Sequence, residues 1–144
     1  MAENFPQSAG RHLLDAMVLA DNKRWDNAVY HAGYVPECAF KVLLEEYMDD
    51  KAVVKKYGHQ LTHMEGIAFD RLRMMFPEVD AKFPKSRLDG TVLAEGHPER
   101  RYENSHRWTE EQALAAVERA RQIYEEVILE RVLDGRIKRE EMDV

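Results

Sequence analysis

The stretch "AVYHAGYVPECAFKVLLEEY", residues 28–47, has an apolar or small residue at nearly every third or fourth position. This spacing is typical of an α-helix that buries one face, and the pattern extends back to Trp25. It predicts a helix over residues 24–49, the most regular in the chain. The buried positions on this face are predicted to be Trp25, Ala28, Val29, Ala32, Val35, Ala39, Phe40, Leu43 and Tyr47.

Two further segments, one on each side of this helix, repeat the helical spacing. Residues 8–21 are predicted to form a helix that buries Leu13, Leu14, Met17 and Val18 on a shared face. Residues 59–76 are predicted to form another, which ends before Pro77. Its buried positions are predicted to be Leu61, Met64, Ala68, Leu72 and Met75.

The last long helix has clear signals at both ends. Thr109 with Gln112 three residues later is a capping-box pattern, so the helix is predicted to begin there. Asp134-Gly135 ends it after Leu133, because glycine suits the residue that follows a helix. The buried positions between these ends are predicted to be Ala113, Ala116, Val117, Ala120, Ile123, Tyr124, Val127 and Ile128.

The segment from Pro77 to Trp108 lacks helical periodicity and contains several prolines and glycines. An irregular segment of this length is usually functional or disordered, although a short helix over residues 78–83 is compatible with the pattern. No run alternates as a strand would. The chain is therefore predicted to be all-α: a four- to five-helix bundle over residues 1–144, in one domain, with a long irregular segment before its last long helix.

The composition excludes some classes of function for this chain. The 144 residues carry a formal net charge of −6, which argues against a generally basic nucleic-acid-coating protein. Any nucleic-acid contact must come from a local patch. With one cysteine, Cys38, no intrachain disulfide forms, and a reducing cytoplasm is the simplest compartment. No apolar run reaches the roughly 20 residues that span a bilayer, so a cytoplasmic protein without membrane contact is predicted.

Several motifs, in order along the chain, resemble one family. They are Gly33-Tyr34 and Glu37-Cys38-Ala39-x-Lys41 in the 28–47 stretch, "GHQLTHM" at 58–64, "RY" at 101–102, and "TEEQALAAVERARQIYEEVI" at 109–128. Together they resemble the HEPN domain (higher eukaryotes and prokaryotes nucleotide-binding) from about Leu13 to Leu133. The resemblance implies a helical bundle that commonly dimerises and that acts on, or binds, RNA or nucleotides.

The family resemblance leaves two functions open. Many HEPN proteins are metal-independent ribonucleases of toxin–antitoxin, CRISPR or other anti-phage systems. Others are non-catalytic modules that bind nucleotide, RNA or a partner protein such as a nucleotidyltransferase. The implied partners are therefore RNA or nucleotide, a second copy of the chain, and a nucleotidyltransferase or antitoxin; no cofactor and no metal are expected.

The stretch "RRYENSH", residues 100–106, contains the candidate catalytic pair. Nuclease members of the family carry an arginine that is followed four to six residues later by a histidine. Arg101 and His106 have this spacing. Histidine titrates near neutral pH and serves as acid or base in attack by the RNA 2′-hydroxyl. Arginine holds phosphate bidentately. In the alternative interpretation, Arg101 pairs with a helix carboxylate, Tyr102 packs on the bundle and His106 is solvated.

The remaining candidates flank this pair or lie in the helices. Arg100 and Arg107 would add positive charge, while Tyr102 would stack on a base and Asn104 would hydrogen-bond one. The resemblance makes Lys41 a ligand contact, although an ion pair with Glu37 is favoured by the spacing.

Other residues are predicted to be structural. His59 and His63 have the spacing of metal ligands on a helix, but no third ligand follows them, so surface or capping roles are expected. Cys38 is predicted to be a buried, inert thiol. Met74 and Met75 are predicted to lie in the core or in a dimer interface.

Overall fold

The computed structural model describes residues 4–48, 61–66, 70, 72–77, 86–95, 97 and 106–135. These residues form helices and connections, with no strand among them, which confirms the all-α prediction. The elements are α1 (Phe5–Asp21), α2 (Trp25–Met48), α4 (Leu61–Gly66), α5 (Leu72–Met75), the 3₁₀ turn η3 (Val92–Ala94), α6 (Glu110–Tyr124), the π-helical turn η5 (Glu125–Leu129) and α7 (Glu130–Leu133).

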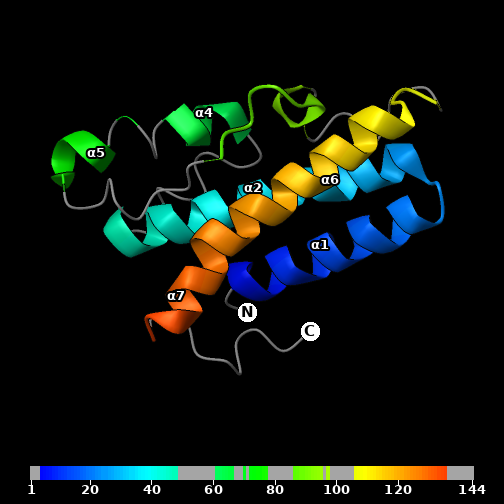
Figure 1. Cartoon of the computed structure of the whole chain (residues 1–144). Helices are drawn as coiled ribbons and strands as arrows, with labels where there is room; N and C mark the ends of the chain where they lie inside the picture. Colours follow the sequence, from blue (N-terminus) through cyan, green and yellow to red (C-terminus); the bar gives the residue numbers. More distant parts are fainter. Residues whose placement is uncertain are drawn as a thin grey trace.

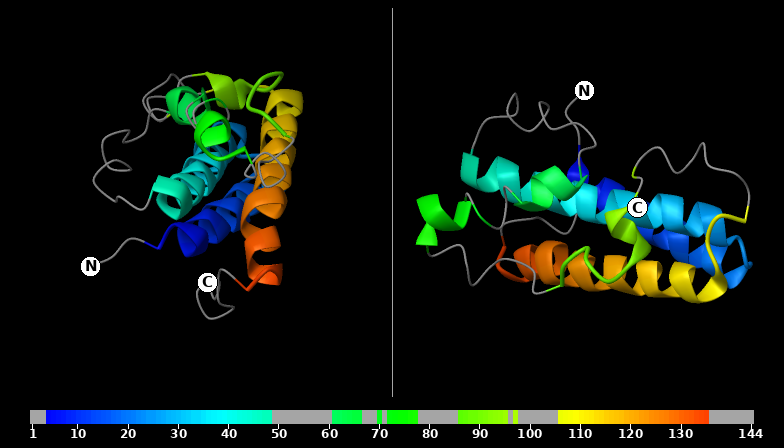
Figure 2. Two further views of the ribbon diagram at one scale, coloured as in Figure 1. Left: turned by 90° about the vertical axis from the view of Figure 1, so that its left-hand side faces the viewer. Right: turned by 90° about the horizontal axis from the view of Figure 1, so that it is seen from above.

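Three long helices make up the body of the molecule. α1 and α2 form an antiparallel pair, and α6 lies along both of them (Figure 1). Seen from the end of the bundle, α4 and η3 lie on the opposite side of α2 from α1 (Figure 2). None of the described helices is long and apolar enough to cross a membrane.

A short turn joins α1 to α2, and an asparagine side chain forms a hydrogen bond at each end of α1. At the start of α1, the Asn4 side chain accepts a hydrogen bond from the Gln7 N–H at 3.0 Å. At its end, the Asn22 side chain donates to the Val18 carbonyl at 2.8 Å. Lys23 has a φ of +61°, a left-handed conformation that reverses the chain within three residues and lets α2 begin at Trp25.

The buried face predicted for α2 is largely confirmed. Ala28, Val29, Ala32, Val35, Ala39, Phe40 and Leu43 are all fully buried, and Trp25 and Tyr47 are half-buried against the same core. The buried face of the last long helix is also confirmed from Ala113 to Ile128, with Tyr124 half-buried. The core therefore lies between α1, α2 and α6, as the apolar periodicity indicates. Leu88, Val92 and Leu93 of the irregular segment also belong to it.

The buried face predicted for α1 is wrong in part. Leu13 is buried, but Leu14, Met17 and Val18 are 51%, 41% and 58% exposed. The positions that face α2 are mostly small, namely Ala9, Gly10, Ala16 and Ala20, with Phe5 and Leu13. Small residues let two helices approach closely, so α1 turns its alanine stripe inward and leaves a second apolar stripe at the surface.

The third predicted helix, over residues 59–76, is helical where it is described, in α4 and α5. Leu61 and Met64 are buried as predicted, while the side chains of Ala68 and Leu72 lie outside the described residues. Met75 is not part of the core: it is 58% exposed, and Met74 is 84% exposed. Phe76 makes the contact with α2 instead, with its ring centroid 6.0 Å from that of Tyr47.

The last long helix begins and ends where the sequence predicts. Thr109 Oγ1 accepts from the Gln112 N–H at 3.1 Å, and Gln112 Oε1 accepts from the Thr109 N–H at 3.0 Å, which completes the capping box. Gly135 follows α7 with a φ of +75°. The helical path widens once, at the π-turn η5, a feature that the apolar period does not reveal.

Polar side chains of the helices hold the described part of the irregular segment. Glu65 of α4 accepts the Leu88 N–H at 2.8 Å, and Glu126 accepts the Ser86 N–H at 3.0 Å. Arg119 donates to the carbonyl of Asp89 at 2.8 Å. Burial raises the pKa of Glu65, and its bond to the Leu88 N–H acts in the opposite direction. The predicted short helix at 78–83 lies outside the described residues.

A candidate binding pocket at the end of the bundle

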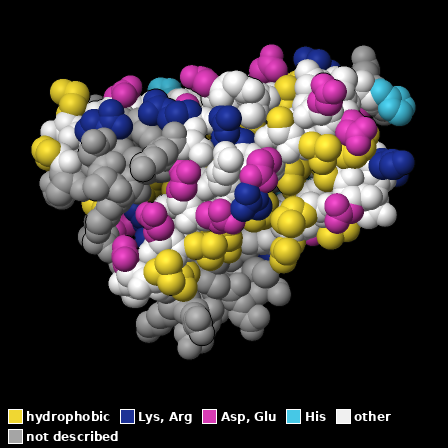
Figure 3. Space-filling view, viewed as in Figure 1, with side chains coloured by type: hydrophobic (Ala, Val, Ile, Leu, Met, Phe, Trp, Pro, Cys, Tyr) yellow, Lys and Arg dark blue, Asp and Glu magenta, His cyan; other side chains and the backbone are white. Residues whose placement is uncertain are grey.

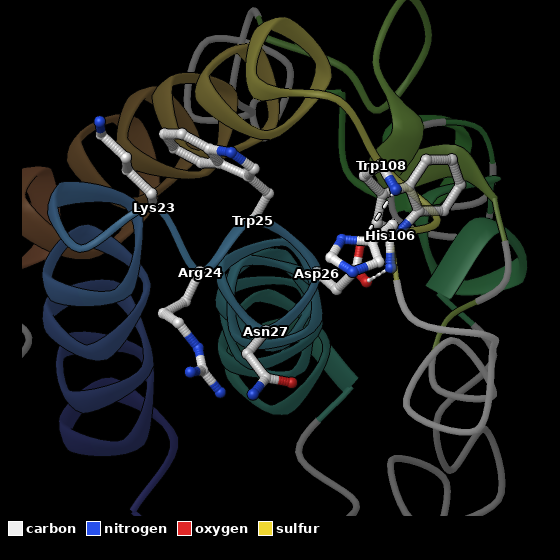
Figure 4. A pocket seen from close by; sticks show the side chains of 7 residues that line it. All are labelled: Lys23, Arg24, Trp25, Asp26, Asn27, His106 and Trp108. Atoms are coloured by element: carbon white, nitrogen blue, oxygen red, sulfur yellow. Dashed lines mark hydrogen bonds between the residues drawn. The ribbon is translucent and has the colours of Figure 1, made fainter.

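A pocket of about 360 Å³ opens at one end of the bundle, between the α1–α2 turn and the residues that precede α6. We call it the end pocket. The residues that line it are Lys23, Arg24, Trp25, Asp26, Asn27, His106 and Trp108 (Figure 4). Two segments some 80 residues apart in the sequence therefore form one site.

Asp26 joins these two segments. Its Oδ2 accepts the backbone N–H groups of His106 at 2.5 Å and of Arg107 at 3.2 Å, and its Oδ1 accepts that of Trp108 at 2.9 Å. Three successive backbone N–H groups that converge on one anion form a concave nest, here occupied by a side-chain carboxylate. Asp26 also lies in the first turn of α2, where the helix dipole favours a negative charge.

His106 lies at the rim of the end pocket with its backbone fixed. Its φ is +64°, a left-handed conformation that is uncommon for residues other than glycine, and Asp26 holds its N–H. The side chain itself is exposed. A fixed backbone with an exposed imidazole is a suitable placement for a group that exchanges protons with a ligand.

Cations and indole rings also line the end pocket or lie next to it. Lys23 and Arg24 are exposed, Trp25 is half-buried and Trp108 is buried. The guanidinium of Arg107 lies over the Trp108 ring, 4.1 Å from its centroid, which is within the range of a cation–π contact. Among the lining residues two cations, Lys23 and Arg24, outnumber the one carboxylate, Asp26, so the pocket has a locally positive character in an acidic chain.

The lining residues point in different directions from the start of α2. Lys23 and Trp25 lie toward α6, whereas Arg24 and Asn27 lie on the opposite side of α2 (Figure 4). His106 and Trp108 lie beside Asp26. A ligand in the end pocket can therefore contact an aromatic face on one side and a cation with an amide on the other.

The structure brings together only part of the site that the sequence predicts. His106 and Arg107 are both at the end pocket or next to it. Arg100, Arg101, Tyr102 and Asn104 lie outside the described residues. The pairing of Arg101 with His106 thus stays a prediction.

Lys41 lies elsewhere, within the bundle. Its ammonium group is 3.2 Å from Glu37 Oε2, and both residues are buried, which confirms the predicted ion pair. Sequence reasoning missed the third member: His97 Nε2 is 2.8 Å from Glu37 Oε1, so the irregular segment is joined to α2 at this point. Lys41 does not line the end pocket, and its predicted ligand contact stays a prediction.

The other candidates have structural placements where they are described. His63 is exposed on α4, and His59 lies outside the described residues. Within the described ranges no three His, Cys, Asp or Glu side chains are grouped as metal ligands. Cys38 is buried, and burial raises its pKa to about 11, so it is protonated at neutral pH as predicted for an inert thiol.

Sequence reasoning missed most of the pocket lining. Lys23, Arg24 and Trp25 form a basic and aromatic run in the turn "DNKRWDN", residues 21–27, and this was the available signal. Asp26 gave none, because an acidic residue in the first turn of a helix has an ordinary local explanation. Only the fold places residues 23–27 beside 106–108.

Comparison with known proteins identifies the family. The model of the HEPN domain family matches residues 2–132, which is most of the chain. The chain therefore belongs to the HEPN family, as its motifs indicate, and its described helices fit this all-α fold. No curated protein and no solved structure matches the chain.

Proposed function

We propose that this HEPN protein binds single-stranded RNA in the end pocket. The observation that carries the proposal is the combination around one opening of two cations, two indole rings and a histidine with a fixed backbone. Sites for single-stranded nucleic acid pair cations that hold the backbone with aromatic faces that stack on bases. A local site of this kind explains how a chain of net charge −6 can hold a polyanion.

The end pocket suits single-stranded RNA better than a duplex. Its volume of about 360 Å³ lies at the lower end of the range of small-molecule sites, so it accommodates one or two nucleotides rather than a double helix. Arg24 is the proposed phosphate contact, and Trp25 is the proposed stacking face. Asn27 supplies an amide donor and acceptor for a base edge.

The first test measures binding as a function of salt. Fluorescence anisotropy with a labelled single-stranded octanucleotide is recorded for the wild type and for Lys23→Gln/Arg24→Gln. We expect the double variant to bind at least about tenfold more weakly, because it loses the charge-assisted hydrogen bond of Arg24 to phosphate and the positive charge of Lys23. The slope of log K against log salt should fall by roughly 0.7 for each phosphate that the variant no longer neutralises.

Arg121→Gln is the matched control for this test. Arg121 is a cation on α6 that pairs with Glu118 and Glu125 and does not line the end pocket. Its substitution should leave both the affinity and the salt slope unchanged. Equal affinities and slopes for the wild type and the double variant would contradict the proposed site.

A second candidate function is metal-independent cleavage of the bound RNA. The observation that favours it is the exposed imidazole of His106 at the rim of the end pocket, on a backbone held by Asp26. In this reaction the 2′-oxygen attacks phosphorus, the bond from phosphorus to the 5′-oxygen breaks, and a 2′,3′-cyclic phosphate remains. His106 would take the proton from the 2′-hydroxyl or donate one to the departing 5′-oxygen, which leaves as a hydroxyl, and Arg101 would stabilise the charge on the phosphorane.

The test for cleavage uses EDTA throughout. We expect the wild type to produce cyclic phosphate from RNA, and His106→Gln to lose this product while it still binds RNA. An oligonucleotide with 2′-deoxyribose at every position should remain intact. RNA binding without cleavage by the wild type would leave the non-catalytic HEPN module, with a nucleotidyltransferase or antitoxin partner, as the better account.

We also propose that the chain forms a homodimer through its exposed apolar stripe. The stripe consists of Leu14, Met17 and Val18 on α1, with Leu114 on α6. Figure 3 shows apolar atoms gathered over these two helices. Charges of both signs border it, with Arg11 and Asp15 on α1, so a second copy related by a two-fold axis can pair acid with base.

The oligomeric state decides this part of the proposal. Light scattering coupled to size exclusion should give twice the chain mass of 16.8 kDa for the wild type. Val18→Glu should give the monomer mass, because a charge on the stripe opposes burial. A wild type that is monomeric at all concentrations would contradict the dimer.

A further inference from the structure

The outer face of α2 continues from the end pocket as a row of aromatic side chains. Asn27 lines the pocket on the side of α2 that faces away from α6 (Figure 4). Three and four residues later come Tyr30 and His31, which share that face, because residues with this spacing are neighbours on a helix. Tyr34 follows one turn further, and all three are half-buried.

His12 of α1 completes the row. Its Nδ1 lies 3.1 Å from Nδ1 of His31, and its ring stacks on Tyr34 with centroids 4.7 Å apart. The Tyr30 and Tyr34 hydroxyl oxygens are 3.3 Å apart. We call His12, Tyr30, His31 and Tyr34 the aromatic row. Its members hold one another in place, so they present a pre-organised surface.

The chemistry of the aromatic row suits nucleobases. Phenol and imidazole rings stack on any base, and their polar atoms lie at the ring edges. Burial, and next the charge of His31, lower the pKa of His12, so this ring is uncharged at neutral pH. From Asn27 to His31 the helix rises by roughly 6 Å, which matches one or two nucleotides at about 3.4 Å per stacked nucleotide.

The charge distribution disfavours the alternative path for a bound strand, which runs from the end pocket along α6. Between Glu110 and Asp134, acidic residues outnumber basic ones by seven to three, and Glu110, Glu111, Glu118 and Glu125 are exposed. Between Phe5 and Tyr34 the two signs are equal, at three each, and the Asp26 carboxylate is engaged by three backbone N–H groups. A polyanion is therefore repelled along α6 and tolerated along α1 and α2.

We infer that a bound RNA strand leaves the end pocket along the outer face of α2, where its next one or two bases stack on Tyr30 and His31. This inference rests on the proposed function, because it adds a second subsite to the same RNA site. It assigns a role to Tyr30 and His31, which the HEPN resemblance does not specify. It also predicts that the affinity of the site depends on the length of the RNA.

The experiment compares a labelled dinucleotide with a labelled octanucleotide. Tyr30→Leu removes the ring, and Tyr30→Phe keeps it. We expect Tyr30→Leu to weaken octanucleotide binding about tenfold and to leave dinucleotide binding unchanged, because only the longer strand reaches the aromatic row. Tyr30→Phe should bind both as the wild type does.

The matched control is Tyr124→Leu, which removes a half-buried tyrosine from α6, on the acidic route. Its octanucleotide affinity should equal that of the wild type. If Tyr30→Leu binds the octanucleotide normally while Lys23→Gln/Arg24→Gln still weakens both ligands, the inferred path is wrong and the end pocket stands. If the wild type binds neither ligand, the proposed function itself fails, and the path fails with it.

Cross-linking keeps the inference testable if Tyr30→Leu does not fold. The wild type is irradiated with an octanucleotide that carries 4-thiouridine at each position in turn, and the attached peptides are mapped. Cross-links within residues 27–34 at positions beyond the pocket-bound nucleotides would support the path along α2. Cross-links confined to residues 110–125 would overturn it.

Discussion

Two regions of this molecule share one apolar core but differ in the polar contacts that hold them. α1, α2 and α6 are joined through apolar contacts, with Phe40, Leu43 and Ile123 fully buried between them. The irregular connection before α6 also buries Leu88, Leu93 and Trp108 in this core. It is joined to the helices in addition by carboxylates of Asp26, Glu65 and Glu126, which accept backbone N–H groups. The comparison shows that apolar burial stabilises both regions, whereas the Asp26 carboxylate additionally places the residues of the end pocket.

The largest predicted effect comes from the apolar region. Phe40→Ala should lower the free energy of unfolding by about 3–5 kcal/mol, because it removes a fully buried ring and leaves a cavity. Chemical denaturation measures this loss. Leu133→Ala, at a position that is 85% exposed, should change stability by about 0.5 kcal/mol or less. Similar losses for the two variants would contradict the placement of the core.

A smaller effect is predicted for the anchor at the end pocket. Asp26→Ala removes the acceptor of three hydrogen bonds, each worth about 0.5–1.5 kcal/mol, and water compensates in part because two of the donors are exposed. Amide hydrogen exchange at residues 106–108 should become faster, while that of α2 beyond Val35 should not. Unchanged exchange at 106–108 would show that Asp26 does not hold this segment.

The helices show how much of the fold follows from sequence. The apolar period of residues 28–47 and the capping box at Thr109 predict α2 and α6, because both signals act over a few residues. α1 carries two apolar stripes, one with larger side chains and one with alanines. Sequence analysis favours burial of the larger side chains, but packing against α2 buries Ala16 and Ala20 instead of Met17. That choice depends on the partner helix and is not encoded locally.

The candidate site is less predictable for a related reason. The motif "RRYENSH" ends at His106 and Arg107 follows it directly, so the sequence alone singles out both residues. It does not single out Asp26 and Arg24, since their roles depend on contacts across some 80 residues of sequence. Helical spacing pairs Glu37 correctly with Lys41, but His97, the third member of this group, comes from a segment without periodicity.

A weaker test is the pH dependence of stability, through His12 of α1. Burial lowers the pKa of His12 in the folded state below its ordinary value of 6.5, so the unfolded chain takes up this proton more readily. The contribution of His12 to stability is therefore present above about pH 6.5 and is lost as the pH falls below it. The unfolding free energy of wild type and His12→Gln is compared at pH 7 and pH 5. We expect a steeper loss for the wild type; equal losses would contradict the assigned pKa shift.

The smallest effect is expected at the surface of α6. Arg121 forms exposed ion pairs with Glu118 and Glu125, and such pairs contribute little because water and salt screen them. Arg121→Gln should melt within a degree or two of the wild type. A melting temperature that falls as much as that of Asp26→Ala would show that the exposed charges on α6 contribute substantially to stability.

The most direct test of the end pocket is a nitrogen-15 NMR titration of the wild type with a single-stranded octanucleotide. Binding at this site predicts that the backbone amides of residues 23–27 and 106–108 shift first and most. Those of Arg131 and Leu133, at the opposite end of the bundle, should stay in place (Figure 1). Largest shifts in α7, or none in residues 23–27 and 106–108 at saturating RNA, would contradict an RNA site in the end pocket.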